Sequence, residues 1–108
     1  MPLSEREYDE RALPELSRLV AALDALEDDA LEAELASDIL TIEFSDGTRY
    51  VINSHRAARQ IWMAAERSAW HFDYDGSRWI ATKTGEELWS VVEAVLGRKL
   101  GRPVRLNR

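Results

Sequence analysis

Two Asp-Gly pairs separate short alternating segments, and they constrain the fold of this chain more than any other feature. In residues 40–44 apolar side chains alternate with polar ones, the pattern of a strand with one buried face. Asp46-Gly47 follows, and residues 50–53 continue as a return strand, so we predict a tight hairpin. Asp75-Gly76 predicts a second hairpin in the same way. With the segments 59–65, 70–74 and 78–82, the pattern predicts an antiparallel meander.

An amphipathic helix precedes this meander. Its apolar positions recur at steps of three and four, as in one buried helix face: Tyr8, Ala12, Leu16, Leu19, Leu23 and Leu26. Pro14 lacks an amide hydrogen and clashes with a preceding helical turn, but it fits the first helical position. We therefore expect a regular helix from Pro14 to Glu27, with a looser turn before it.

A second helix follows the meander. Thr84 and Glu87 have the spacing of a capping box, which predicts a helix start. Apolar residues then continue at helical spacing, and Gly101 and Pro103 end the helix. Two helices at opposite ends of an antiparallel meander predict an α+β two-layer sandwich that forms a single domain over residues 1–108.

Residues 30–36 fit two structures. Leu31, Ala33 and Leu35 alternate with Glu32 and Glu34, which suits a half-exposed strand. Ala, Leu and Glu are also strong helix formers, so composition favours a helix. The residues alone leave both assignments open.

Composition excludes several classes of function. The chain has no cysteine and two histidines, so a thiolate site and a His-rich metal site are excluded, and any metal would be held mainly by oxygen ligands. No apolar run approaches the ~20 residues that span a bilayer. No secretory signal is visible at the N-terminus. We therefore expect a cytoplasmic protein without a membrane partner.

Charge is divided unevenly along the chain. Residues 1–46 hold 14 acids and 3 bases, whereas residues 47–108 hold 6 acids and 11 bases. An acidic half argues against nucleic acid as its ligand, and no nucleic-acid motif is present in the basic half. The division suggests two electrostatically different partners.

Six carboxylates gather around the end of the first helix and the segment after it. We call them the acidic ridge: Asp24, Glu27, Asp28, Asp29, Glu32 and Glu34. The first three lie three and four residues apart, so we expect them on one helix face, and the last two share one side of a strand. Crowded carboxylates attract hard cations weakly, although a solvated acidic face is the simpler interpretation.

A second candidate site lies in the meander. Ile61 and Met63 occupy the core face of their strand, so Gln60 and Trp62 should point outward. An indole ringed by polar residues is typical of an interface anchor, although a partly covered core tryptophan is the simpler interpretation. We call Asn53, Gln60, Trp62 and His71 the Trp62 cluster. His55, in the expected loop after Asn53, has no predicted role.

These short signatures, taken in order, resemble the frataxin family in its bacterial form. They are residues 40–44 (LTIEF), 46–47 (DG), 50–53 (YVIN), 60–62 (QIW), 71–76 (HFDYDG), 79–80 (WI) and 84–89 (TGEELW). The resemblance spans roughly residues 15 to 106. The chain departs from it at Leu26 and Ala30, where relatives tend to carry acids, and at Ser37-Asp38 and Ala69-Trp70, where glycines are usual.

The resemblance implies a strand over residues 30–36 and a role in iron–sulfur cluster assembly. It implies that the acidic ridge binds Fe²⁺ or Fe³⁺ weakly, in competition with other divalent cations. It implies that the Trp62 cluster docks on a cysteine desulfurase and an iron–sulfur scaffold protein, with the chain acting as iron donor or regulator. A bacterial cytosolic monomer that self-associates with iron fits the same family.

Two alternatives remain open at this stage. One is a weak ferroxidase, although an exposed carboxylate ridge with little histidine lacks the defined, buried ligands that efficient Fe²⁺ oxidation needs, so we do not expect an enzyme. The other is a metal-independent acidic module that binds protein partners. Turnover with Fe²⁺ and oxygen separates the first from simple binding, and partner binding after metal removal separates the second.

Overall fold

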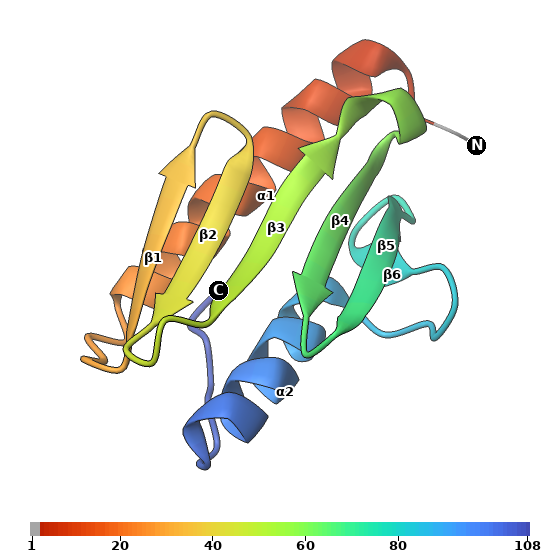
Figure 1. Cartoon of the computed structure of the whole chain (residues 1–108). Coiled ribbons are helices and arrows are strands. Elements are labelled where there is room, and N and C mark those ends of the chain that lie inside the picture. The colour runs from red at the N-terminus through yellow and green to blue at the C-terminus, as the bar shows by residue number, and fades with distance from the viewer. Residues whose placement is uncertain (1–2) are drawn as a thin grey trace.

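The computed structural model describes residues 3–108 and has two layers, with both helices on one face of a six-stranded sheet (Figure 1). This is the α+β sandwich that the sequence predicts. The elements are α1 Glu5–Asp24, β1 Leu31–Ala36, β2 Ile39–Phe44, β3 Arg49–His55, the 3₁₀ turn η1 Arg56–Ala58, β4 Gln60–Ala65, β5 Ser68–Tyr74, β6 Trp79–Ala81 and α2 Leu88–Leu100.

The sheet is a meander in chain order, and every neighbouring pair is antiparallel. Both Asp-Gly turns form as predicted. Gly47 and Gly76 take the positive φ angles of +89° and +107° that favour glycine. Asp46 accepts from the Thr48 amide at 2.9 Å, and Asp75 accepts from the Ser77 and Arg78 amides. The alternative of a helix over residues 30–36 is excluded, because these residues form β1 paired with β2.

The core lies between the sheet and the two helices. Alternate residues of each central strand face it, so that β2 buries Leu40, Ile42 and Phe44 whereas its other residues are partly or fully exposed. The apolar positions that the helix and strand periodicities assign to the buried faces are indeed buried, among them Leu16, Leu23, Leu40, Ile42, Ile61, Met63, Phe72, Val92 and Val95. Of the three tryptophans outside β4, Trp79 and Trp89 are buried, whereas Trp70 is only partly covered.

The first helix begins much earlier than predicted. Ser4 caps it: the Ser4 hydroxyl accepts from the Glu7 amide at 3.1 Å, and the Glu7 carboxylate accepts from the Ser4 amide at 3.0 Å. The helix then runs through Pro14 and ends at Asp24, short of Glu27. The expectation of a start at Pro14 was wrong because the capping box and a continuous buried face outweigh one lost hydrogen bond.

The second helix begins later than predicted. Its N-cap is Glu87, whose carboxylate accepts from the amides of Trp89 and Ser90. Thr84 instead accepts from the Glu86 amide, so it caps a turn before the helix. The predicted end is confirmed, since Gly101 closes α2 with a left-handed φ of +73°.

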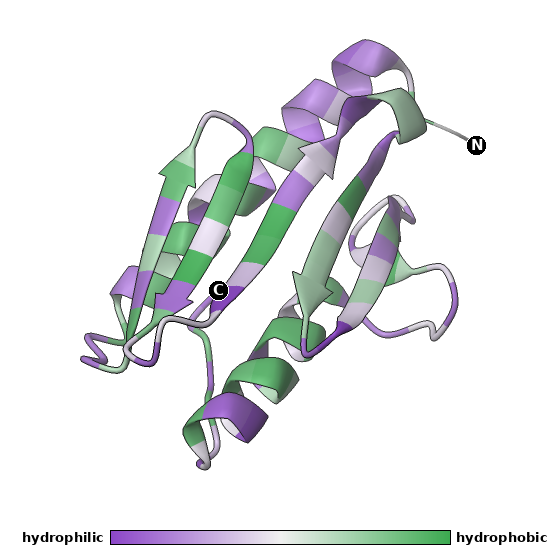
Figure 2. Cartoon of the chain, viewed as in Figure 1, coloured by the Kyte–Doolittle hydropathy of each residue, from purple (hydrophilic) through white to green (hydrophobic). Residues whose placement is uncertain are grey.

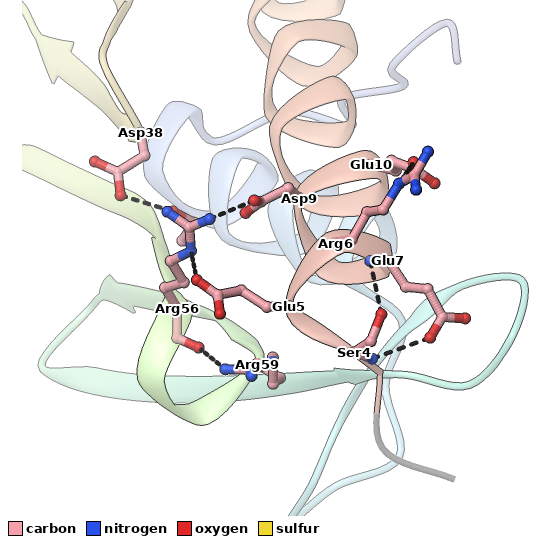
Figure 3. Close-up of polar contacts among 10 residues, drawn as sticks. Ser4, Glu5, Arg6, Glu7, Asp9, Glu10, Asp38, Arg56 and Arg59 are labelled. Carbon is pink, nitrogen blue, oxygen red and sulfur yellow. Dashed lines mark hydrogen bonds and ion pairs between the residues drawn. The ribbon is translucent and has the colours of Figure 1, made fainter.

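Charged residues attach the first turns of α1 to η1, the turn that joins β3 and β4. Arg56 of η1 pairs with Asp9 and, at 3.3 Å, with Glu5 (Figure 3). Tyr8 donates from its hydroxyl to the Gln60 carbonyl at 2.6 Å. Figure 2 shows these first turns as hydrophilic, in contrast to the hydrophobic middle of the sheet. Polar contacts therefore add to the buried Tyr8 and Ala12 in holding this end of the helix.

Candidate functional site

The acidic ridge forms where α1 ends and the edge strand β1 begins. Asp24 is the last helical residue, and Glu27 takes a left-handed φ of +49° in the connection, which turns the chain back toward the sheet. Five of the six predicted residues line one shallow depression: Asp24, Glu27, Asp28, Asp29 and Glu32. Glu34 lies farther along β1, outside this depression.

Asp28 differs from the other ridge residues. One of its carboxylate oxygens accepts from the Ala30 amide at 2.8 Å, and the other pairs with the guanidinium of Arg102 from the C-terminal segment. The Asp28 side chain is only 12% exposed, whereas Asp24, Glu27, Asp29 and Glu32 are exposed. Within the acidic ridge, the Asp28 carboxylate is therefore bound to protein groups, whereas the carboxylates of the exposed residues are accessible to solvent.

Glu43 is a ridge neighbour that sequence analysis missed. It lies directly opposite Glu32 across the β1–β2 pair, and both border a second depression with Asp29. Arg49 on β3 pairs with Glu43 at 3.1 Å and partly neutralises it. The alternation in residues 40–44 predicts that Glu43 lies on the outer face of its strand. Its position opposite Glu32 depends on the register between β1 and β2, which the sequence does not specify.

The ridge does not form a defined coordination cage. Within residues 3–108, no three His, Asp or Glu side chains converge closely enough to hold a metal ion. Exposed carboxylates on a helix end, a loop and a strand can instead attract a hard cation through their summed negative potential, with solvent completing its coordination. Such a site would be weak and of low selectivity.

The Trp62 cluster assembles on the outer face of the sheet, away from both helices. Asn53, Trp62 and His71 stand opposite one another on β3, β4 and β5, in one row across the sheet. Ile61 and Met63 are buried on the other face, so the predicted orientation of Trp62 is confirmed. Gln60 accepts from the Trp62 indole N–H at 2.7 Å and donates to Asp73 at 3.0 Å.

Trp62 points outward but is only partly exposed, because two imidazoles cover its faces. The ring centroid of His71 lies 4.3 Å from that of Trp62, and the centroid of His55 lies 3.7 Å away, each with an interplanar angle of 14°. His55 ends β3 instead of lying in a loop. It is a residue that sequence analysis missed, although the alternation Val51, Asn53, His55 would have placed it on this face.

The stack gives the outer face a rigid aromatic centre. Asn53 donates from its side chain to the Ser54 carbonyl at 3.0 Å, so its amide is also held in place. Ile39, 46% exposed, lies opposite Asn53 on β2 and extends the row with an apolar side chain. A partner could cover this surface with little loss of side-chain freedom, which favours tight binding.

No helix within residues 3–108 has the length and apolar character needed to cross a membrane. The ridge and the Trp62 cluster occupy separate parts of the molecule: the ridge borders β1, an edge of the sheet, whereas the cluster centres on β4. The two sites can therefore act independently.

Known proteins resemble the chain over nearly its whole length. A family model described as a frataxin-like domain matches residues 1–102. A protein named iron-sulfur cluster assembly protein CyaY from Cupriavidus pinatubonensis is 33% identical over 109 residues, with 98% of each chain covered. The protein of the same name from Thioalkalivibrio sulfidiphilus is 36% identical over 99 residues, with 90% of this chain and 91% of the relative covered.

Solved structures share the fold. A frataxin from Psychromonas ingrahamii superposes with a TM-score of 0.88 at 21% identity, covering 98% of this chain and 100% of that one. A trimeric frataxin from Saccharomyces cerevisiae, complexed with ferrous, superposes with a TM-score of 0.73 at 22% identity, covering 94% and 90%. At these identities the likeness concerns the fold alone.

Proposed function

The chain belongs to the frataxin-like family, and from that premise we propose that it binds ferrous iron weakly at the acidic ridge and serves iron–sulfur cluster assembly. The relatives named for that process support the proposal. The observation that carries it is the depression lined by Asp24, Glu27, Asp28, Asp29 and Glu32. Four of these carboxylates are exposed without an ion pair within residues 3–108, so they can approach a cation.

We further propose that the Trp62 cluster docks on a cysteine desulfurase and its scaffold protein in the bacterial cytosol. The rigid row of Asn53, Trp62 and His71 supports this role, because hot spots are often tryptophans ringed by polar groups. With iron on the ridge and partners on the sheet, one domain can deliver iron or adjust the rate of assembly. No enzymatic step is required of this chain.

Anaerobic Fe²⁺ titration followed residue by residue by NMR tests the ridge. The amides of residues 24–32 should respond first, with micromolar or weaker affinity, a binding free energy of about 8 kcal/mol or less. Mn²⁺ should compete, because exposed oxygen ligands discriminate poorly between hard cations.

The double variant Asp29→Asn and Glu32→Gln should weaken iron binding about 10-fold. Its matched control is Glu7→Gln with Glu10→Gln, which removes the same charge from the opposite end of α1 and should change affinity less than 2-fold. Equal effects of the two pairs would show that iron senses only net charge, and the ridge would not be the site. Oxygen consumption during Fe²⁺ addition measures any ferroxidase activity, for which we expect no turnover.

A further inference from the structure

The C-terminal segment brings a positive charge of the chain itself into the acidic ridge. After α2, the amides of Gly101 and Arg102 both donate to the Gly97 carbonyl, at 2.9 and 3.2 Å, which reverses the chain direction. Gly97 permits this close turn, because an added Cβ would lie 3.3 Å from the Arg102 carbonyl oxygen. The turn directs Arg102 toward the connection between α1 and β1, where its guanidinium pairs with Asp28.

The rest of the segment is attached as well. Val104 and Leu106 are each 7% exposed and belong to the core. The Leu106 amide donates to Glu93 of α2 at 2.7 Å, and Arg108 pairs with Glu87. The backbone of Arg102 is therefore positioned by an attached segment, and its half-exposed side chain reaches Asp28 from there.

A guanidinium on Asp28 and a metal ion in the same depression oppose each other. Each carboxylate oxygen of Asp28 already has one partner, the Ala30 amide on one and Arg102 on the other, so a cation at the second oxygen would compete with the guanidinium. A divalent ion bound by the neighbouring carboxylates would also be repelled by the fixed positive charge. Arg102 does not line the depression itself, but it pairs with Asp28, which does, so a cation already contacts one of the lining carboxylates.

We propose that Arg102 is a built-in competitor for the cation site, which a divalent metal must displace from Asp28 in order to bind tightly. This inference rests on the proposed function of the ridge. Displacement frees an oxygen of Asp28 as a further ligand and removes one of the contacts that hold the C-terminal segment. By thermodynamic reciprocity, metal binding loosens the segment, and a loosened segment strengthens metal binding.

Arg102→Gln and Arg105→Gln form a matched pair that tests the proposal. Both remove one positive charge from the same segment, but Arg105 is exposed and forms no ion pair within residues 3–108. In anaerobic Fe²⁺ titrations of the full chain, Arg102→Gln should tighten binding about 10-fold, equivalent to ~1.4 kcal/mol. Arg105→Gln should tighten it less than 2-fold.

Leu106→Ala separates the charge from the order of the segment. It loosens the same segment while keeping the guanidinium, so it should tighten iron binding by no more than about 3-fold. In the parent protein, the amide resonances of Val104 and Leu106 should shift as iron binds, although neither residue lines the depression.

The outcomes distinguish this inference from the function on which it rests. Equal affinities for Arg102→Gln and Arg105→Gln, with iron still on the ridge, overturn the role of Arg102 and leave the proposed function standing. An equal gain for Leu106→Ala and Arg102→Gln assigns the effect to segment order and also overturns it. Absence of ridge binding in both the parent and Arg102→Gln overturns the two together.

Discussion

At the scale of single residues, Trp62 is partly covered by neighbouring side chains although it lies on the solvent-facing side of the sheet. His55 and His71 cover its two ring faces, and Gln60 takes its indole N–H, so the side chain is half-buried without entering the core. Aromatic pairs of this kind contribute about 0.5–1.5 kcal/mol each beyond their buried area. The indole is therefore held in one orientation before any partner arrives.

Trp62→Ala should lower the free energy of unfolding by about 1–2 kcal/mol, since it removes two stacking contacts but leaves no enclosed cavity. It should weaken docking to the desulfurase–scaffold complex by about 2 kcal/mol, measured by calorimetry, while iron binding at the ridge stays unchanged. Leu13→Ala is the control, because Leu13 is a 43% exposed apolar residue on α1, away from this face. A loss of several kcal/mol in stability with docking intact would make Trp62 a core residue.

The residues of both sites could be predicted from the sequence, but their environments could not. The ridge follows from six acids close together in the chain, and the outward direction of Trp62 follows from strand alternation. Arg102 on Asp28 and His55 on Trp62 depend on where distant segments meet in the fold. A pattern of neighbouring residues does not specify contacts between distant segments. Only the structure therefore shows that Asp28 is paired with Arg102 and that His55 covers one face of the Trp62 indole.

At the scale of the elements, the strands were predictable and the helix ends were not. Alternation and Asp-Gly turns fix a strand locally, and β2 to β6 appear within a few residues of their predicted positions. For β1 the residues alone left strand and helix open, and only the family resemblance implied the strand. Helix ends depend on competition between neighbouring signals. Ser4 with Glu7 outweighs Pro14 at the start of α1, and Glu87 outweighs Thr84 at the start of α2.

Pro14 consequently lies inside a regular helix, where it should be destabilising. Its ring nitrogen cannot donate to the carbonyl four residues earlier, and a proline in a helix interior costs about 3 kcal/mol relative to alanine. Because Pro14 is exposed, Pro14→Ala removes this cost without disturbing the core. We expect the free energy of unfolding to rise by about 1–3 kcal/mol, measured by urea denaturation.

Leu13→Ala serves again as the control, since it exchanges the neighbouring exposed residue for the same alanine and leaves the proline in place. Its effect should stay within about 0.5 kcal/mol, as expected for a surface site. A loss of stability on Pro14→Ala would mean that the proline stabilises α1 by restricting the unfolded chain, and that the helix has already relaxed around it.

At the scale of the whole molecule, α2 holds one end of the sheet through two ion pairs. Lys99 pairs with Asp46 of the β2–β3 turn at 2.7 Å, and Arg98 binds Glu66 of the β4–β5 turn through two hydrogen bonds at 2.7 and 2.8 Å. The hydrogen bond from Lys99 lowers the pKa of Asp46 well below its usual range, and that from Arg98 lowers the pKa of Glu66. Acid should therefore weaken the attachment of the sheet to α2.

The sign of this pH dependence follows from linkage. A carboxyl whose pKa is lower in the folded than in the unfolded state stabilises the fold fully above its unfolded pKa, near 4. That stabilisation is lost as pH falls toward the folded pKa. The transition temperature should therefore fall as pH drops below about 4, by a modest amount because both ion pairs are solvent-exposed.

The chain should unfold cooperatively on heating at pH 7 in excess chelator, because its core consists of apolar side chains and needs no metal.

The double variant Asp46→Asn and Glu66→Gln should lower the transition temperature at pH 7 but flatten its fall between about pH 5 and pH 2, because fewer protons are taken up on unfolding. Replacing the partners instead, with Arg98→Gln and Lys99→Gln, should flatten the same limb, since both carboxyls then lose the contact that lowers their pKa. Thermal unfolding of the three proteins across this range measures both effects. An acid limb as steep in the two variants as in the parent would place the acid sensitivity elsewhere in the molecule.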